Sequence, residues 1–168
     1  ARESLSITGG LLRALQQAHT NLAEWNRRSL REHRVAVGVT CVVIREDEAT
    51  IVQVGPGTAY VTGSQGVTRL STEGLPAAAP LGGAGDIEPR FTAASIAGRE
   101  VLLLTSTVEQ IVGLRQIEDS LGAGAEGALA ELFRRTREVT DMTAVLVADL
   151  DIDELGGEPV PLDLDADD

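Results

Sequence analysis

The sequence predicts an α+β domain in which helices flank an antiparallel β-sheet or sandwich. An amphipathic helix opens the chain, a block rich in β-branched residues follows, and helix and strand patterns continue to the end. With 168 residues, 43% of them hydrophobic, the chain is long enough to bury one core. Aromatic residues make up only 2%, so Val, Leu, Ile and Ala must fill that core.

The first element is a helix over roughly residues 9–32. Its apolar residues recur at steps of four and three, which places them on one stripe of the helix. They are Leu11, Leu15, Ala18, Leu22 and Trp25. We expect this stripe to pack on a sheet, and binding to a partner is the alternative.

A block of strands follows the helix. Residues 35–47 are too β-branched for a comfortable helix and favour a buried strand. Three short strands are expected next, near 49–54, 58–62 and 67–71, with GSQG (63–66) as the last turn. Together these strands predict an antiparallel meander.

The second half of the chain begins with a loop and ends with a strand. Residues 70–89 are rich in Pro and Gly and lack periodicity, so they predict a loop. The expected elements after it are strands at 90–96 and 100–106 around a turn at Gly98, one or two helices at 107–121, a helix at 124–138 and a strand at 142–150. Residues Ala125, Leu129, Leu132, Phe133 and Thr136 mark the apolar stripe of that last helix.

Charge is unevenly spread along the chain. The net charge is −12, and residues 151–168 hold eight of the 26 acidic residues and no basic one. This Gly-, Pro- and Asp-rich stretch is expected to be an extension of a 1–150 domain, either solubilising or docking on a basic partner. All 14 basic residues are Arg, which excludes a lysine nucleophile. We expect no nucleic-acid partner, because no basic excess exists to release counterions.

The compartment is predicted from what the sequence lacks. No apolar run approaches the roughly 20 residues that span a bilayer, and no signal-peptide pattern opens the chain. The one cysteine, Cys41, lies in an apolar run and cannot form an internal disulfide. We therefore expect a cytoplasmic protein with no membrane partner.

The stretch VGPGTAYV (54–61) could cradle a phosphate or form a turn. A phosphate loop needs a helix after its glycines, but a strand pattern follows here, and Pro56 lacks an N–H group. A type II turn with Gly57 at positive φ, bending a hairpin, is predicted instead. ITGG (7–10) could hold an anion at the start of the first helix, or simply begin it.

Other candidate chemistry is sparse. His19 and His33 are the only histidines and have no Cys or carboxylate at ligand spacing, so no zinc site is predicted. No serine lies in a G-x-S-x-G elbow. A small-molecule sensor that binds its ligand at the Gly-rich residues 82–85 is a further hypothesis.

One asparagine and six short segments after it are more informative in series than any one of them. They are Asn21 on the first helix, GVTCVV (38–43), VGPGTAY (54–60), RLST (69–72), PLGG (80–83), LLLTST (102–107) and TDMTAVLV (140–147). Their order resembles the second half of the metal-dependent protein phosphatase family (PPM, or type 2C), including its bacterial sporulation-phosphatase branch. The resemblance covers roughly residues 10–150 and implies the α+β sandwich of that family without its N-terminal segment.

The polar signature of that family is not kept. The family's Asp-Ser-Arg hairpin corresponds to Pro56, Gly57 and Thr58 here, and its metal-binding aspartates correspond to Thr107 and Thr140. Active members hold two Mg²⁺ or Mn²⁺ ions through carboxylates and waters, and neutral threonine cannot replace those ligands. The degenerate motif positions are Gly55, Pro56, Gly57, Thr58, Ser106, Thr107, Thr140 and Asp141.

The resemblance therefore implies a pseudophosphatase, without a catalytic residue or a metal cofactor, that acts as a regulatory or protein-interaction module. We expect its contact surface at the 55–58 turn, the 72–86 loop and residues 105–109. Without the family's N-terminal strands, an apolar strand such as 39–44 could lie at an open edge. Either a homodimer or a piece of a larger protein is then expected.

The alternative is an active metal-dependent serine/threonine phosphatase, completed by a missing segment or a second subunit. Mg²⁺ or Mn²⁺ would then be its cofactor, with Asp141 and Asp149 as the candidate acids.

Overall fold

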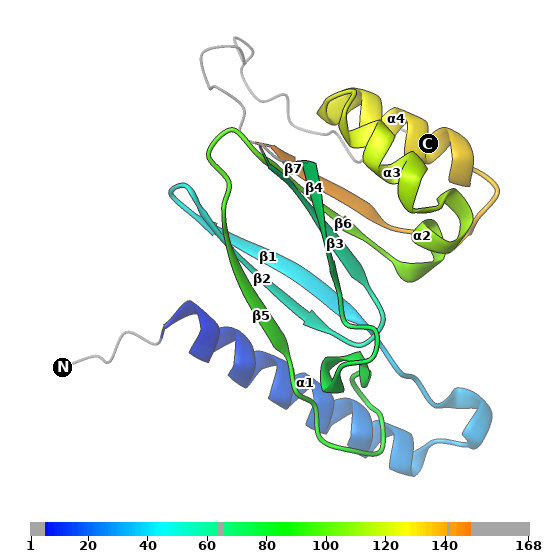
Figure 1. The fold of residues 1–168 in the computed structure, drawn as a ribbon. Coiled ribbons are helices and arrows are strands. Elements are labelled where there is room, and N and C mark those ends of the chain that lie inside the picture. Colours follow the sequence, from blue (N-terminus) through cyan, green and yellow to red (C-terminus); the bar gives the residue numbers. More distant parts are fainter. Residues whose placement is uncertain (1–5, 64–65, 141, 149–168) are drawn as a thin grey trace, which may run out of the picture.

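The computed structural model describes residues 6–63, 66–140 and 142–148. These residues form four layers, with two facing antiparallel sheets and helices on both outer faces (Figure 1), so the expected α+β class is confirmed. The predicted acidic tail at 151–168, Asp141, Asp149 and part of the 63–66 turn lie outside the described residues. Within the described residues, no helix combines the length and apolar character needed to cross a bilayer.

The strands divide between two sheets instead of forming one meander. The first sheet has the order β1 (Val39–Arg45), β2 (Glu48–Val54), β5 (Arg90–Ser95), and the second has the order β4 (Gly66–Ser71), β3 (Thr58–Gly63), β6 (Glu100–Leu104), β7 (Ala144–Ala148). β2 pairs with β1 and β5, whereas β3 pairs with β4 and β6. The predicted hairpin bend at 54–61 is therefore wrong, because the chain crosses there from one sheet to the other.

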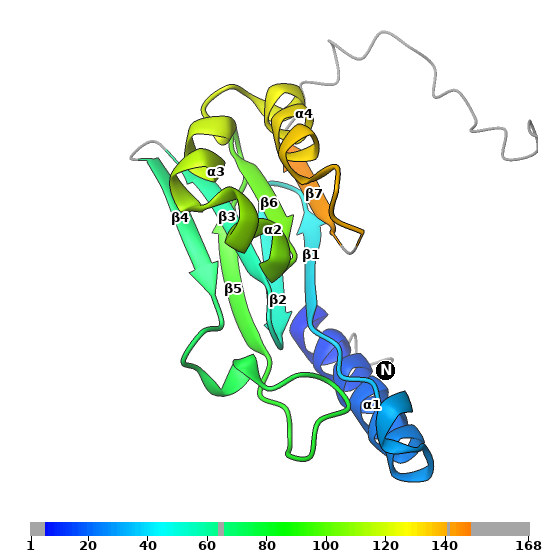
Figure 2. The ribbon, with the colours of Figure 1, turned by 90° about the vertical axis from the view of Figure 1, so that its right-hand side faces the viewer.

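Helices cover the two outer faces. α1 (Ile7–Arg28) lies along the three-stranded sheet, and α2 (Ser106–Val112), α3 (Leu114–Leu121) and α4 (Ala125–Thr136) lie on the four-stranded sheet (Figures 1 and 2). Two 3₁₀ turns, Arg31–His33 and Pro76–Ala78, interrupt the loops. The Ser6 side chain caps α1 by accepting a hydrogen bond from the Gly9 N–H at 3.1 Å. α1 ends at Arg28, earlier than predicted, because the backbone of Ser29 is extended.

Side chains that alternate along the central strands build three apolar clusters. On β2, Ile51 packs between the sheets and Val52 packs toward α1. On β6, Leu103 packs between the sheets and Leu102 packs toward the α2–α4 layer. Both faces of these strands are buried, which explains why their sequences are nearly continuous apolar runs.

Two predicted helix faces are corrected by the structure. Trp25 is 63% exposed, so the packed stripe of α1 stops at Leu22. On α4, Phe133 is 67% exposed, and the buried positions are Ala128, Leu132 and Thr136. These three residues repeat every fourth position, so the buried stripe is narrower and turned relative to the predicted one.

Each sheet has an edge strand on the same side of the sandwich. Among the described strands, β1 pairs with β2 alone and β7 pairs with β6 alone. Figure 2 shows these two strands on one side of the molecule, and residues of both line a common groove. The residues predicted to lie at an open edge, 39–44, are in β1.

Candidate functional site

The segment that crosses between the sheets is held rigidly. Gly55 donates its N–H to the Ala77 carbonyl at 2.7 Å, and its own carbonyl accepts from the Thr72 hydroxyl at 2.8 Å. Its φ is +73°, and a Cβ there would lie 2.8 Å from Gly38 Cα and 3.1 Å from Pro80 Cα. Backbone conformation and close approach both require glycine at this position.

The positive φ was predicted for Gly57, and this prediction is wrong, since Gly55 has it. Gly57 is needed for a different reason, because a Cβ there would lie 2.5 Å from Thr40 Oγ1. Beneath the crossing segment, the buried Gln53 donates from Nε2 to the Leu70 carbonyl at 3.1 Å. The segment thus keeps a fixed shape while exposing Pro56 to solvent.

The other degenerate positions lie at the same end of the four-stranded sheet. Ser106 and Thr107 begin α2 directly after β6, and Thr140 lies in the connection that leads to β7. Thr105 and Thr143 join these two places, with Thr105 N–H donating to the Thr143 carbonyl at 3.1 Å and Thr143 N–H donating to Thr105 Oγ1 at 3.2 Å.

The structure brings together only some of the predicted site residues. Pro56, Gly57, Thr58 and Ser106 line a hollow of about 440 Å³, which we call the rim hollow. Thr107 and Thr140 do not line it, and Asp141 lies outside the described residues. On the β1–β7 side, a groove of about 280 Å³ is lined by hydroxyls and apolar groups and has no acidic residue in its wall.

An arginine–glutamate pair in the rim hollow was missed by the sequence analysis. Arg69 on β4 donates from Nε to Glu109 Oε1 on α2 at 2.9 Å, and a second guanidinium nitrogen donates to the same oxygen. Their side chains are 32% and 17% exposed. The two residues are 40 positions apart, so no local pattern could have indicated the pair.

The electrostatics of this pair follow from partial burial. Burial raises the pKa of Glu109, but the nearby Thr58 hydroxyl and the Arg69 guanidinium outweigh it, so the pKa is lowered overall. Tyr60 lies beside the pair, and its burial, together with the negative charge of Glu109, raises its pKa to about 12. Glu109 Oε2 and Tyr60 Oη find no hydrogen-bond partner among the described residues. The carboxylate is therefore charged at neutral pH, with Arg69 balancing its charge.

The described residues do not fit a centre of two divalent ions. Such a centre needs several carboxylates that converge on one point. Within the described residues, no three His, Cys, Asp or Glu side chains are grouped so that they could hold a metal. Glu73, the other carboxylate in the rim hollow, also faces Arg69, 3.9 Å away, and is 85% exposed.

No family model and no curated protein matches the sequence. Solved structures match the fold. The serine/threonine phosphatase Stp1 from Staphylococcus aureus has a TM-score of 0.73 at 14% identity, over 89% of this chain and 70% of that chain. The catalytic domain of the phosphatase PstP, in complex with two manganese ions, has a TM-score of 0.63 at 18% identity, over 78% and 66%.

A third similar structure is PppA of Pseudomonas aeruginosa, described as a key regulatory component of the T6SS, with a TM-score of 0.67 at 14% identity over 83% and 68%. At such identities the likeness shows the fold alone. The chain therefore has a fold like that of these phosphatases, which confirms the fold that its segment order indicated.

Proposed function

We propose that this PPM-like domain is a pseudophosphatase, a regulatory or protein-interaction module without phosphatase activity. The observation that carries the proposal is the state of the rim hollow. Neutral or apolar residues occupy the motif positions in its wall, and its more buried carboxylate, Glu109, is bound to Arg69. Hydrolysis in the family that the chain resembles relies on metal-activated water, and a wall whose two carboxylates, Glu73 and Glu109, both face Arg69 disfavours metal binding there.

Two divalent ions held close together repel each other, and each gives up part of its hydration on binding. Only fixed negative charges offset both costs, and a threonine hydroxyl supplies none at neutral pH. Thr107 and Thr140, which stand at the metal-binding aspartate positions of the resemblance, therefore argue against a loaded site.

Two measurements test this proposal. Hydrolysis of p-nitrophenyl phosphate should stay at the uncatalysed rate in the presence of Mn²⁺, and calorimetry should detect no Mn²⁺ binding that Asp141→Asn removes. Asp141→Asn is the control variant, because Asp141 is the one acid left among the degenerate positions. Turnover that requires Mn²⁺ and disappears in Asp141→Asn would refute the proposal and favour an active phosphatase.

The proposed interaction is with a protein, which can be a second copy of this chain. Edge strands present unpaired N–H and C=O groups, and β1 contains no proline and only one charged residue, Arg45 at its end. Ile44 on this strand is 42% exposed. These features support pairing along β1.

Light scattering at increasing protein concentration tests the second-copy form of the interaction. The unmodified chain should form a dimer, and Ile44→Lys should reduce it to a monomer. Ile111→Lys is the matched control, since Ile111 is 50% exposed on α2, away from β1. A monomer at every concentration would exclude pairing between copies. Cytoplasmic location and the absence of nucleic-acid and membrane partners stay predictions from the sequence.

A further inference from the structure

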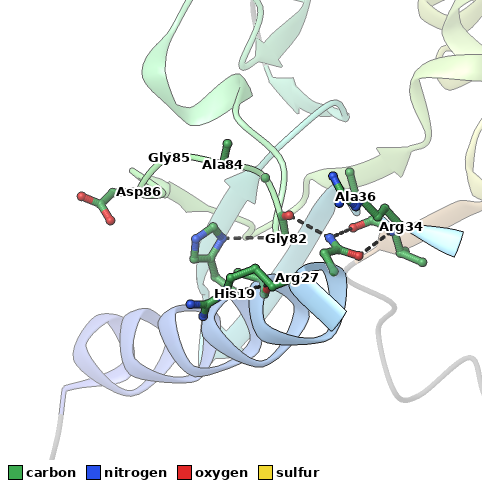
Figure 3. A pocket seen from close by; sticks show the side chains of 12 residues that line it. His19, Arg27, Arg34, Ala36, Gly82, Ala84, Gly85 and Asp86 are labelled. Atoms are coloured by element: carbon green, nitrogen blue, oxygen red, sulfur yellow. Dashed lines mark hydrogen bonds between the residues drawn. The ribbon is translucent and has the colours of Figure 1, made fainter. Parts of the chain in front are cut away.

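A separate cavity lies between α1 and the glycine-rich loop, away from the motif positions. Its volume is about 720 Å³, within the usual range for small-molecule sites. Figure 3 shows His19 and Arg27 on α1, Arg34 from the following segment and residues 82–86 around it. None of the degenerate motif positions lines it.

Asn26 joins the three segments that form the cavity wall. Its Nδ2 donates to the carbonyls of Val35 at 2.6 Å and Gly82 at 2.9 Å, and its Oδ1 accepts from the Val35 N–H at 2.8 Å. Gly82 has φ +78°, and a Cβ there would lie 2.7 Å from the Val35 carbonyl oxygen. The wall is therefore a preformed structure, with Asn26 used as a clamp.

One side-chain donor in the cavity wall is available to a ligand. His19 accepts the Gly82 N–H at 3.2 Å through Nδ1, so in its neutral form Nε2 carries the proton and is available as a donor. The backbone N–H groups of residues 84–86 make no hydrogen bond among the described residues.

The charge of the wall is opposite to that of the whole chain. The side chains of Arg27 and Arg34 form no ion pair with any described acidic residue, although the chain has a net charge of −12. The one carboxylate in the wall belongs to Asp86. Arg27 also donates from Nε to the Ala23 carbonyl at 3.4 Å. Two guanidiniums that no carboxylate neutralises attract a strongly anionic group, and guanidiniums suit phosphate in particular. A single carboxylate suits a hydroxyl of the same ligand.

We propose that this cavity binds a small phosphorylated molecule, such as a sugar phosphate. The phosphate is attracted by the guanidiniums of Arg27 and Arg34, and Asp86 accepts a hydrogen bond from a ligand hydroxyl. The proposal is independent of phosphatase activity, so it stands or fails separately from the pseudophosphatase proposal.

Calorimetry with three probes tests the chemical class. Ribose 5-phosphate should bind measurably, inorganic phosphate more weakly, and ribose not at all at the same concentrations. Equal affinities for ribose and ribose 5-phosphate would overturn the role of the phosphate. Equal affinities for inorganic phosphate and ribose 5-phosphate would overturn the binding of an organic ligand, and no binding by any probe would overturn the site.

Variants locate the binding in this cavity. Arg34→Gln and Arg27→Gln should each weaken ribose 5-phosphate binding about tenfold, the loss expected for one charge-assisted contact. Arg13→Gln changes the charge of exposed α1 equally but lies outside the cavity wall, and it should leave affinity within about twofold. Equal effects of Arg13→Gln and Arg34→Gln would overturn the location.

A filling variant gives a test that does not depend on charge. A Cβ at Gly85 would meet nothing within 4 Å, and Gly85 has no positive φ, so a larger side chain fits without strain. Gly85→Leu should abolish ribose 5-phosphate binding while leaving the melting temperature almost unchanged. Retained affinity in Gly85→Leu would contradict the proposal.

Discussion

Replacing Arg69, whose guanidinium carries the positive charge in the rim hollow, is the most direct test of how the Arg69–Glu109 pair stabilises the fold. In Arg69→Met, Glu109 keeps its charge but loses both guanidinium contacts. An exposed ion pair is worth about 0–1 kcal/mol, and breaking a fully buried one costs about 3–5 kcal/mol. With side chains 32% and 17% exposed, the pair lies between these limits. We expect a loss of about 2 kcal/mol, which lowers the melting temperature by about 4–8 °C.

The stability lost in Arg69→Met should depend on pH, and the direction of this dependence follows from the pKa of Glu109. The pKa of Glu109 is lowered in the folded chain, so its stabilising contribution is present above the ordinary glutamate pKa and is lost as pH falls through the folded value. In Arg69→Met, burial without the cation should raise the pKa of Glu109 instead, so acidification relieves the buried charge. The difference in unfolding free energy between the unmodified protein and Arg69→Met should be largest near neutral pH. It should become smaller as the pH is lowered.

A double-mutant cycle measured by chemical denaturation gives the interaction energy between Arg69 and Glu109. Arg69→Met combined with Glu109→Gln should be more stable than Arg69→Met alone, because no unpaired carboxylate remains. Arg134→Met is the control, since Arg134 pairs with Glu131 on the exposed surface of α4, and its loss should change stability little. Additive effects of Arg69→Met and Glu109→Gln, or a gap that does not change with pH, would refute the reasoning.

Three further predictions concern packing and can be measured by the same denaturation experiment. Gly55→Ala should cost about 3 kcal/mol, from positive φ and close contacts, whereas Gly74→Ala, with the same φ and open space, should cost about 1 kcal/mol. Asn26→Ala should cost about 2–3 kcal/mol by removing the clamp, and Asn21→Ala, which loses one exposed contact with Gln17, less than about 0.5 kcal/mol. Leu132→Ala should cost about 2–5 kcal/mol, because that side chain is fully buried. Equal costs within either matched pair, or a negligible cost for Leu132→Ala, would contradict the corresponding packing argument.

The order and type of the elements could be predicted because they depend on local patterns. Apolar residues that recur every second position indicated the strands, and those that recur about every fourth position indicated the helices, with bounds correct within a few residues. The resemblance indicated how these elements are arranged. The sheet that each strand joins does not depend on local sequence. A Gly-Pro-Gly between two strand patterns is typical of a hairpin, yet β2 and β3 pair with other strands, and long-range pairing decided the outcome.

The site was predicted less well than the fold. The sequence indicated which motif positions had lost their carboxylates, but not that Arg69 binds Glu109, since the two lie on different elements. Asn21 was selected from the resemblance, whereas the asparagine that joins α1 to the glycine-rich loop is Asn26, one and a half turns further along the helix. Contacts of this kind appear only once the layers are assembled.

The close approach of Gly55 to Gly38 and Pro80 links the crossing segment to the loop that forms one wall of the α1 cavity. Pro80 stands two residues before Gly82, and the intervening Leu81 exchanges both backbone hydrogen bonds with Val37. Where main chain lies directly against main chain, few side-chain atoms can absorb a shift, so we expect a displacement of the crossing segment to affect the loop that contains Gly82. A ligand in the α1 cavity would then change the affinity of a partner protein for the crossing segment. Thermodynamic reciprocity requires that the partner changes the affinity of the ligand by the same factor.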